Sequence, residues 1–128
     1  MRIALECRAV FSGGGRIGRY AAGLARGLAQ AGEADDLLYL TTRRQESPIV
    51  PGVAAEQRAF PAAMIDPRWE QLHLPGALGE WEAELYHSTC FSAPIAGEDC
   101  AVVSMVHDVV FRARPELVEP GLRGYLDR

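Results

Sequence analysis

The sequence predicts an α/β fold in which a parallel sheet carries helices on both faces. Short apolar runs, each long enough for one strand, alternate along the chain with amphipathic stretches of helical spacing. Strands buried on both faces are continuously apolar and belong to parallel sheets. With right-handed crossovers, the pattern predicts the strand order 3-2-1-4-5. The 128 residues are enough for one domain with its own core, and residues 1–128 are expected to form it.

The composition is that of a globular protein and excludes several classes of function. Apolar residues make up 48% of the chain and charged residues 23%. The net charge of −4 argues against a nucleic-acid partner, because such proteins are usually basic. Cys7, Cys90 and Cys100 lack the spacing of a zinc site or a disulfide framework, so no metal is expected. Neither a signal peptide nor a membrane-length apolar run is present, and the expected location is cytoplasmic.

The first half of the chain predicts three strands and one helix. Residues 1–6 form the first strand. A helix is expected from Ile17 to Gly32, because its apolar residues recur every three or four positions and glycine is a common helix stop. Residues 37–41 form a second strand, and residues 53–60 a weaker third one in which polar residues blur the alternation.

The second half predicts two further strands and two interrupted helices. Pro67 occupies the favoured first position of a helix, which Pro75 would kink or split. Residues 85–87 and 101–106 are apolar enough for the fourth and fifth strands. The last helix is expected over residues 116–128, broken or restarted at the Pro-Gly pair within it.

A glycine-rich stretch, residues 12–20, joins the first strand to the first helix. Glycine is used where the backbone takes a positive φ or comes close to another molecule. A glycine turn that opens a helix presents free N–H groups at the positive end of the helix dipole, which suits a phosphate or carboxylate. The predicted anion-binding residues are Gly14, Gly15, Arg16 and Gly18. The alternative is an ordinary flexible connection.

Two of the three histidines follow predicted strands at corresponding places. His87 and Ser88 end the fourth strand, and His107 and Asp108 follow the fifth. Ligands of parallel sheets bind beyond the carboxyl ends of the strands, so these residues would join the glycine-rich stretch at one rim. His107 and Asp108 are the predicted catalytic residues, since an imidazole transfers protons near neutral pH and a carboxylate can bias its charge. The alternative is that Asp108 satisfies loop N–H groups, His107 packs under a helix, and His87 begins a plain turn.

A series of short motifs runs along nearly the whole chain in one order. They are residues 1–10, Gly-Arg-Ile-Gly-Arg-Tyr at 15–20, Trp-Glu-Gln-Leu at 69–72, Leu-Tyr-His-Ser at 85–88, and Val-His-Asp-Val-Val-Phe at 106–111 leading to Pro115. Together they resemble the N-terminal domain of GT-B-fold glycosyltransferases of the family 4 (group 1) type. Glu6 stands where that family often has aspartate, and Arg16 enlarges its usual glycine turn.

The resemblance implies a retaining transfer of a sugar from a nucleotide-sugar donor to an acceptor hydroxyl, between two Rossmann-like domains. The chain would be the acceptor-side, N-terminal half, with the C-terminal nucleotide-sugar domain absent, and would be inactive alone. Its glycine loop would approach the donor phosphates, and His107 the reacting sugar. No cofactor is implied beyond the donor substrate. The implied partners are both substrates, the missing domain in cis, and a membrane surface contacted peripherally. The fragment is also expected to self-associate through an apolar patch at the rim or a sheet edge.

Two other classes of function stay open. An NAD(P)-binding domain of an oxidoreductase fits Gly13-x-Gly15-x-x-Gly18 literally, and Arg43-Arg44 would suit a 2′-phosphate. Against it, residues 6–12 separate the strand from the first glycine, which should follow the strand closely. The third class is a non-catalytic interaction domain.

Overall fold

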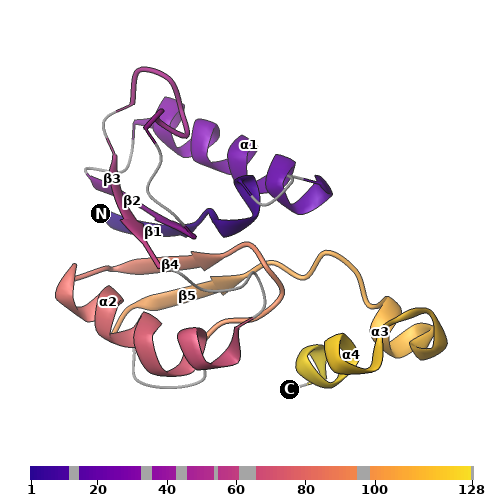
Figure 1. The fold of residues 1–128 in the computed structure, drawn as a ribbon. Helices are drawn as coiled ribbons and strands as arrows, with labels where there is room; N and C mark the ends of the chain where they lie inside the picture. Colours follow the sequence, from indigo (N-terminus) through magenta and orange to yellow (C-terminus); the bar gives the residue numbers. More distant parts are fainter. Residues whose placement is uncertain are drawn as a thin grey trace.

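The computed structural model describes residues 1–11, 15–32, 36–42, 46–53, 55–60, 66–94 and 99–127. Within these ranges five parallel strands form one sheet in the order β3-β2-β1-β4-β5, with helices on both faces (Figure 1). This Rossmann-like α/β architecture confirms the predicted fold class and strand order. The strands are β1 (Arg2–Glu6), β2 (Asp36–Thr41), β3 (Glu56–Ala59), β4 (Leu85–Ser88) and β5 (Ala101–Ser104). The helices are α1 (Gly15–Ala31), α2 (Leu74–Glu80), α3 (Val110–Ala113) and α4 (Pro120–Leu126), with short turns η1 (Arg8–Val10), η2 (Trp69–His73) and η3 (Pro115–Leu117).

The two faces of the sheet bury separate cores, because neighbouring residues of a strand point to opposite sides. On β1, Ile3 and Leu5 belong to the core that includes Ala25 of α1, whereas Ala4 belongs to the core that includes Leu74 of α2. Figure 1 shows α1 and α2 on opposite faces of the sheet. The same alternation places His87 of β4 on the α1 face, where it contacts Tyr20, and its neighbours Tyr86 and Ser88 on the α2 face.

Helix α1 matches the predicted amphipathic stripe. It begins at Gly15, where φ is +48°, and the chain leaves it through Gly32, where φ is +66°, in the left-handed conformation of a glycine helix stop. Its buried residues, Gly18, Ala21 and Ala25, are small, so the helix axis lies close to the rest of the fold.

The helix expected after Pro67 is split, as predicted. A π-helical turn, η2, precedes α2, and Pro75 stands in the first turn of α2. Proline has no N–H to donate to the preceding turn, so the chain changes its helical register there. The predicted restart of the last helix at its Pro-Gly pair is confirmed, because α4 begins at Pro120. The helix expected from residue 116 is wrong, since Pro115–Leu117 form only the short turn η3, and α3 was not predicted. Helix α4 starts at Pro120 because Glu119 accepts the N–H of Leu122 at 2.9 Å and caps it.

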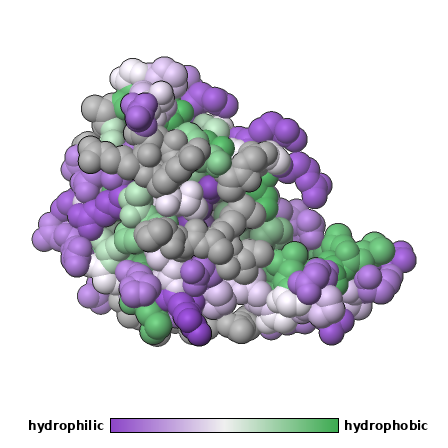
Figure 2. All heavy atoms as spheres, in the orientation of Figure 1, coloured by the Kyte–Doolittle hydropathy of each residue, from purple (hydrophilic) through white to green (hydrophobic). Residues whose placement is uncertain are grey.

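Strand β5 is exposed along its whole length in spite of its apolar sequence. It is an edge strand, and Val102 and Val103 on it are exposed together with Val106, Val109 and Val110 that follow. Figure 2 shows apolar residues gathered over α3 and α4. An apolar surface at a sheet edge was expected from the sequence, whereas self-association stays a prediction. Among the described helices none is long and apolar enough to cross a membrane.

Gly18→Ala should destabilise the fold, because a Cβ there would lie 2.6 Å from the carbonyl oxygen of Ala9 in η1. We expect a loss of about 1–3 kcal/mol in the free energy of unfolding, measured by urea denaturation. Gly23 in the same helix faces open space. Gly23→Ala is therefore the matched control, and it should stabilise by up to about 1 kcal/mol because alanine favours helix. Equal effects of the two changes would contradict a close approach of α1 to η1.

Candidate functional site

Tyr20 of α1 brings both predicted histidines together at the carboxyl rim of the sheet. Its hydroxyl lies 3.3 Å from Nε2 of His87. Its ring packs edge-on against His107, with centroids 5.3 Å apart, and Phe91 packs on the same imidazole at 5.2 Å. Tyr20 was not among the predicted site residues. The sequence feature that could have identified Tyr20 is its position four residues after Arg16, on the same side of the helix.

His107 is oriented by a hydrogen bond to the backbone. Its Nε2 lies 2.7 Å from the carbonyl oxygen of Thr89. Because a carbonyl only accepts, Nε2 carries the hydrogen, and Nδ1 is the nitrogen left for a ligand. Thr89 is itself held, since its hydroxyl donates to the backbone carbonyl of Glu6 at 3.0 Å. The imidazole therefore has a defined tautomer and a fixed support.

The residues of the predicted glycine site differ in their surroundings: some are open and one is packed. Gly14 lies outside the described residues. Gly15 has a left-handed backbone and open space beside its Cα, whereas Gly18 packs against the backbone of Ala9. Arg16 is exposed and lines a cavity of about 320 Å³ together with Asp108. The rest of this cavity is mostly apolar and includes Phe91, Phe111, Val118, Leu122 and Leu126.

Two predicted site residues already have structural partners. Oδ1 of Asp108 accepts the backbone N–H of Val110 at 3.1 Å, which is the loop role that the alternative interpretation gave it. Its second oxygen still has acceptor capacity. Ser88 is fully buried and donates to Oε2 of Glu6 at 3.0 Å, so its side chain does not reach the surface.

No protein-family model, curated protein or solved structure matches the chain. The resemblance to glycosyltransferases therefore stays a prediction. Among the described residues, no group of three histidine, cysteine, aspartate or glutamate side chains is placed to hold a metal ion.

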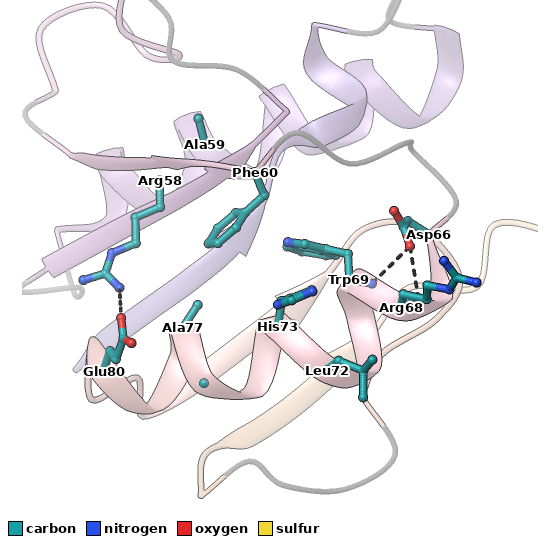
Figure 3. Close-up of a pocket in the computed structure, with 11 residues that line it drawn as sticks. Arg58, Ala59, Phe60, Asp66, Arg68, Trp69, Leu72, His73, Ala77 and Glu80 are labelled. Carbon is teal, nitrogen blue, oxygen red and sulfur yellow. Dashed lines mark hydrogen bonds and ion pairs between the residues drawn. The ribbon is translucent and has the colours of Figure 1, made fainter.

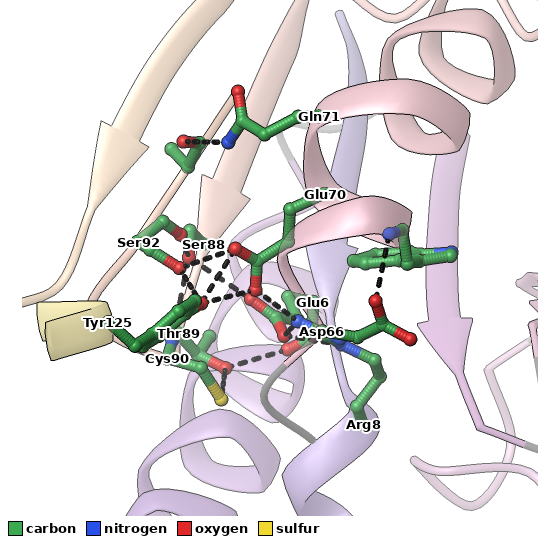
Figure 4. Close-up of polar contacts among 12 residues, drawn as sticks. Glu6, Arg8, Asp66, Glu70, Gln71, Ser88, Thr89, Cys90, Ser92 and Tyr125 are labelled. Atoms are coloured by element: carbon green, nitrogen blue, oxygen red, sulfur yellow. Dashed lines mark hydrogen bonds and ion pairs between the residues drawn. The ribbon is translucent and has the colours of Figure 1, made fainter. Parts of the chain in front are cut away.

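A buried charge cluster at the rim of the α2 face was not predicted (Figure 4). Arg8 is fully buried, and its Nε donates to Oε1 of Glu6 at 2.7 Å. Its Nη2 lies 3.2 Å from Oε1 of Glu70, and its Cζ lies 4.0 Å from the ring centroid of Trp69. The cluster joins the end of β1, the η1 turn and the η2 turn.

Hydroxyl groups satisfy the remaining charge of this cluster. Two buried carboxylates face one guanidinium, and a buried charge is costly unless hydrogen bonds compensate it. Tyr125 of α4 donates to Glu70, with its hydroxyl 2.5 and 2.6 Å from the two carboxylate oxygens. Ser92 donates to the same carboxylate at 2.9 Å, and Tyr86 lies 3.3 Å from Oε2 of Glu6.

The neighbouring cysteines are not nucleophiles near neutral pH. Burial raises the pKa of the Cys90 thiol to about 12, and the nearby Glu6 carboxylate adds to this effect. Burial also raises the pKa of Cys7. Because only the thiolate attacks, both side chains act as small buried groups.

Tyr125→Phe should destabilise the chain by about 1.5–3 kcal/mol, because the change removes a hydrogen bond to a buried carboxylate. Tyr125 is also the buried residue of α4, so amide exchange of α4 should accelerate. The measurements are urea denaturation and hydrogen exchange. Tyr20→Phe, which loses only the 3.3 Å contact to His87, is the control and should cost less than about 1 kcal/mol. Equal losses from the two changes would show that Glu70 does not depend on Tyr125.

His87 should titrate below its ordinary pKa of 6.5, because burial disfavours the imidazolium. As the pH falls from 6.5, the unfolded chain takes up a proton at this residue before the folded chain does. The free energy of unfolding should therefore decrease until the pH passes the folded pKa. NMR titration of the ring protons gives the pKa, and His87→Gln should flatten this part of the stability profile. A measured pKa at or above 6.5 would refute the burial argument.

Proposed function

We propose that the chain is the acceptor-side domain of a retaining glycosyltransferase, which transfers a sugar from a nucleotide-sugar donor to an acceptor hydroxyl. A second domain would hold most of the nucleotide, across a cleft at the carboxyl rim. The site on this chain would bind the acceptor and approach the donor phosphates. The donor is a substrate, and no cofactor is needed.

The observation that carries the proposal is that Arg16 and Asp108, from distant parts of the chain, line one cavity at the rim. Phe91 lines the same cavity and contacts His107, so the cavity adjoins the histidine cluster. A mostly apolar pocket with a few polar groups is the usual form of a small-molecule site. The Arg16 guanidinium suits a phosphate, and the Asp108 carboxylate suits a hydroxyl.

His107 would contact the reacting sugar or the acceptor hydroxyl through Nδ1. With Nε2 donating to Thr89, the neutral ring offers the Nδ1 lone pair, which accepts a hydrogen bond or a proton from a hydroxyl. The rings of Tyr20 and Phe91 fix the imidazole plane. Such a fixed group needs little reorganisation when a substrate binds.

The dinucleotide alternative is less well supported. The η1 turn stands between β1 and α1, whereas the dinucleotide fingerprint places its first glycine directly after the strand. Gly13 and the pair Arg43-Arg44 lie outside the described residues. The exposed apolar strand β5 supports the alternative of an interaction domain. That alternative predicts that the chain binds neither nucleotide sugars nor NADH.

His107→Gln should lower sugar transfer by about 10²–10⁴-fold in the full gene product that carries this chain. Nε2 of glutamine can keep the bond to the Thr89 carbonyl, while the group equivalent to Nδ1 is lost. The chain should therefore stay folded. Transfer from a panel of nucleotide sugars is measured by nucleotide release, with binding of NADH tested in parallel.

The matched control is His73→Gln, because His73 is an exposed histidine outside the rim cluster. It should leave transfer unchanged. Transfer that survives His107→Gln, or saturable binding of NADH in place of any nucleotide sugar, would overturn the proposed function.

A further inference from the structure

We infer that the α2 face carries a second ligand site, which binds an aromatic compound bearing a carbonyl or carboxylate oxygen. The site is a cavity of about 910 Å³ between β3 and the η2–α2 helix (Figure 3). The residues used in this argument are Arg58, Phe60, Trp69, His73, Gly76 and Glu80, all of which line the cavity. Tyr20 and the histidine cluster are not part of it, so the inference does not depend on the proposed function.

The indole of Trp69 supplies a buried hydrogen-bond donor. Among the described residues its Nε1 has no hydrogen-bond partner, although Trp69 is only 4% exposed. The indole of Trp81, in contrast, donates to Oε2 of Glu56 at 3.1 Å. Buried polar groups are nearly always paired, so an unpaired one calls for an explanation. In Figure 3 the nitrogen-bearing end of Trp69 faces the space between β3 and the helix, where a bound oxygen would accept its hydrogen.

The position of this donor is fixed before any ligand binds. The guanidinium of Arg8 covers the Trp69 ring at 4.0 Å, and Phe60 packs against it with centroids 5.5 Å apart. A preorganised group loses little conformational freedom on binding. The π-helical turn η2 begins at Trp69, and π turns are frequent at functional sites.

The walls of the cavity favour a flat aromatic body. Phe60, Trp69 and His73 supply rings, and Gly76 leaves open space on the helix wall. The cation of Arg58 is already held by Glu56 at 3.0 Å and by Glu80 at 3.4 Å. Asp66 and Arg68 also line the cavity, where Asp66 accepts the backbone N–H groups of Arg68 and Trp69 and the Arg68 side chain is exposed. Among these groups the indole N–H is the buried donor without a partner in the described residues, so it is the one that a ligand oxygen would satisfy, and an amide oxygen serves as well as a carboxylate.

Titration of the ¹⁵N-labelled chain with benzamide and with benzoate tests the inference. Saturable movement of the Trp69 indole N–H signal is expected, while the Trp81 signal stays in place. Benzylamine has the same ring but no acceptor oxygen, and it should bind at least about tenfold more weakly.

Gly76→Leu should fill the cavity and weaken benzamide binding at least about tenfold. Gly79→Leu is the matched control, because Gly79 lies on the same helix with equal open space but does not line the cavity. It should change binding by less than about twofold. A Trp69 signal that does not move, equal weakening by both leucine variants, or benzylamine binding as tightly as benzamide would overturn the inference.

Discussion

The buried contact of Arg8 with Glu6 and Glu70 is the constraint on which the carboxyl rim depends. It gathers three carboxyl-rim segments, namely the end of β1, the η1 turn and the η2 turn, and Tyr125 adds α4 through Glu70. Burying charges contributes little net stability, because desolvation opposes the Coulomb attraction. Its effect is on specificity: an arrangement that separated Arg8 from its carboxylates would leave an uncompensated charge in the interior. The path of the chain from β1 into η1 is therefore defined.

The same residue that anchors this cluster also supports the histidine site on the opposite face. The Glu6 side chain bonds to Arg8, while its backbone carbonyl accepts the hydroxyl of Thr89. Thr89 in turn accepts Nε2 of His107 through its own carbonyl. Alternation along the strands keeps the two sets of side chains apart. The ion cluster thus acts on His107 through the backbone, as a positioning element without contact to any ligand.

Local sequence patterns were enough to predict the sheet, its strand order, α1 and the proline-split helix, because each depends on periodicity or on proline and glycine geometry within a short window. The ion cluster could not be predicted in this way. Arg8 and Glu70 are 62 positions apart, and in the sequence Glu6 and Arg8 only interrupt an apolar run. An apolar surface at the rim or at a sheet edge was predicted, but not that β5 carries it. The apolar sequence of β5 is that of a buried strand, and the rest of the sheet decides which strand lies at the edge.

Each candidate site places a neutral ring nitrogen near aromatic walls, with charged side chains such as Arg16 and Asp108, or Arg58 and Glu80, lining the cavity beside it. Arg8 is bonded to Glu6 and Glu70. Nδ1 of His107 is the ring nitrogen that the bond to Thr89 leaves for a ligand, and Nε1 of Trp69 has no hydrogen-bond partner among the described residues. Each ring is held by packing on two sides, His107 by Tyr20 and Phe91 and the Trp69 indole by neighbours of its own. A neutral group is desolvated at far lower cost than an ion. Aromatic packing, supported by the buried Arg8 cluster, therefore orients these two ring nitrogens. A ligand that bonds to either nitrogen displaces no salt bridge.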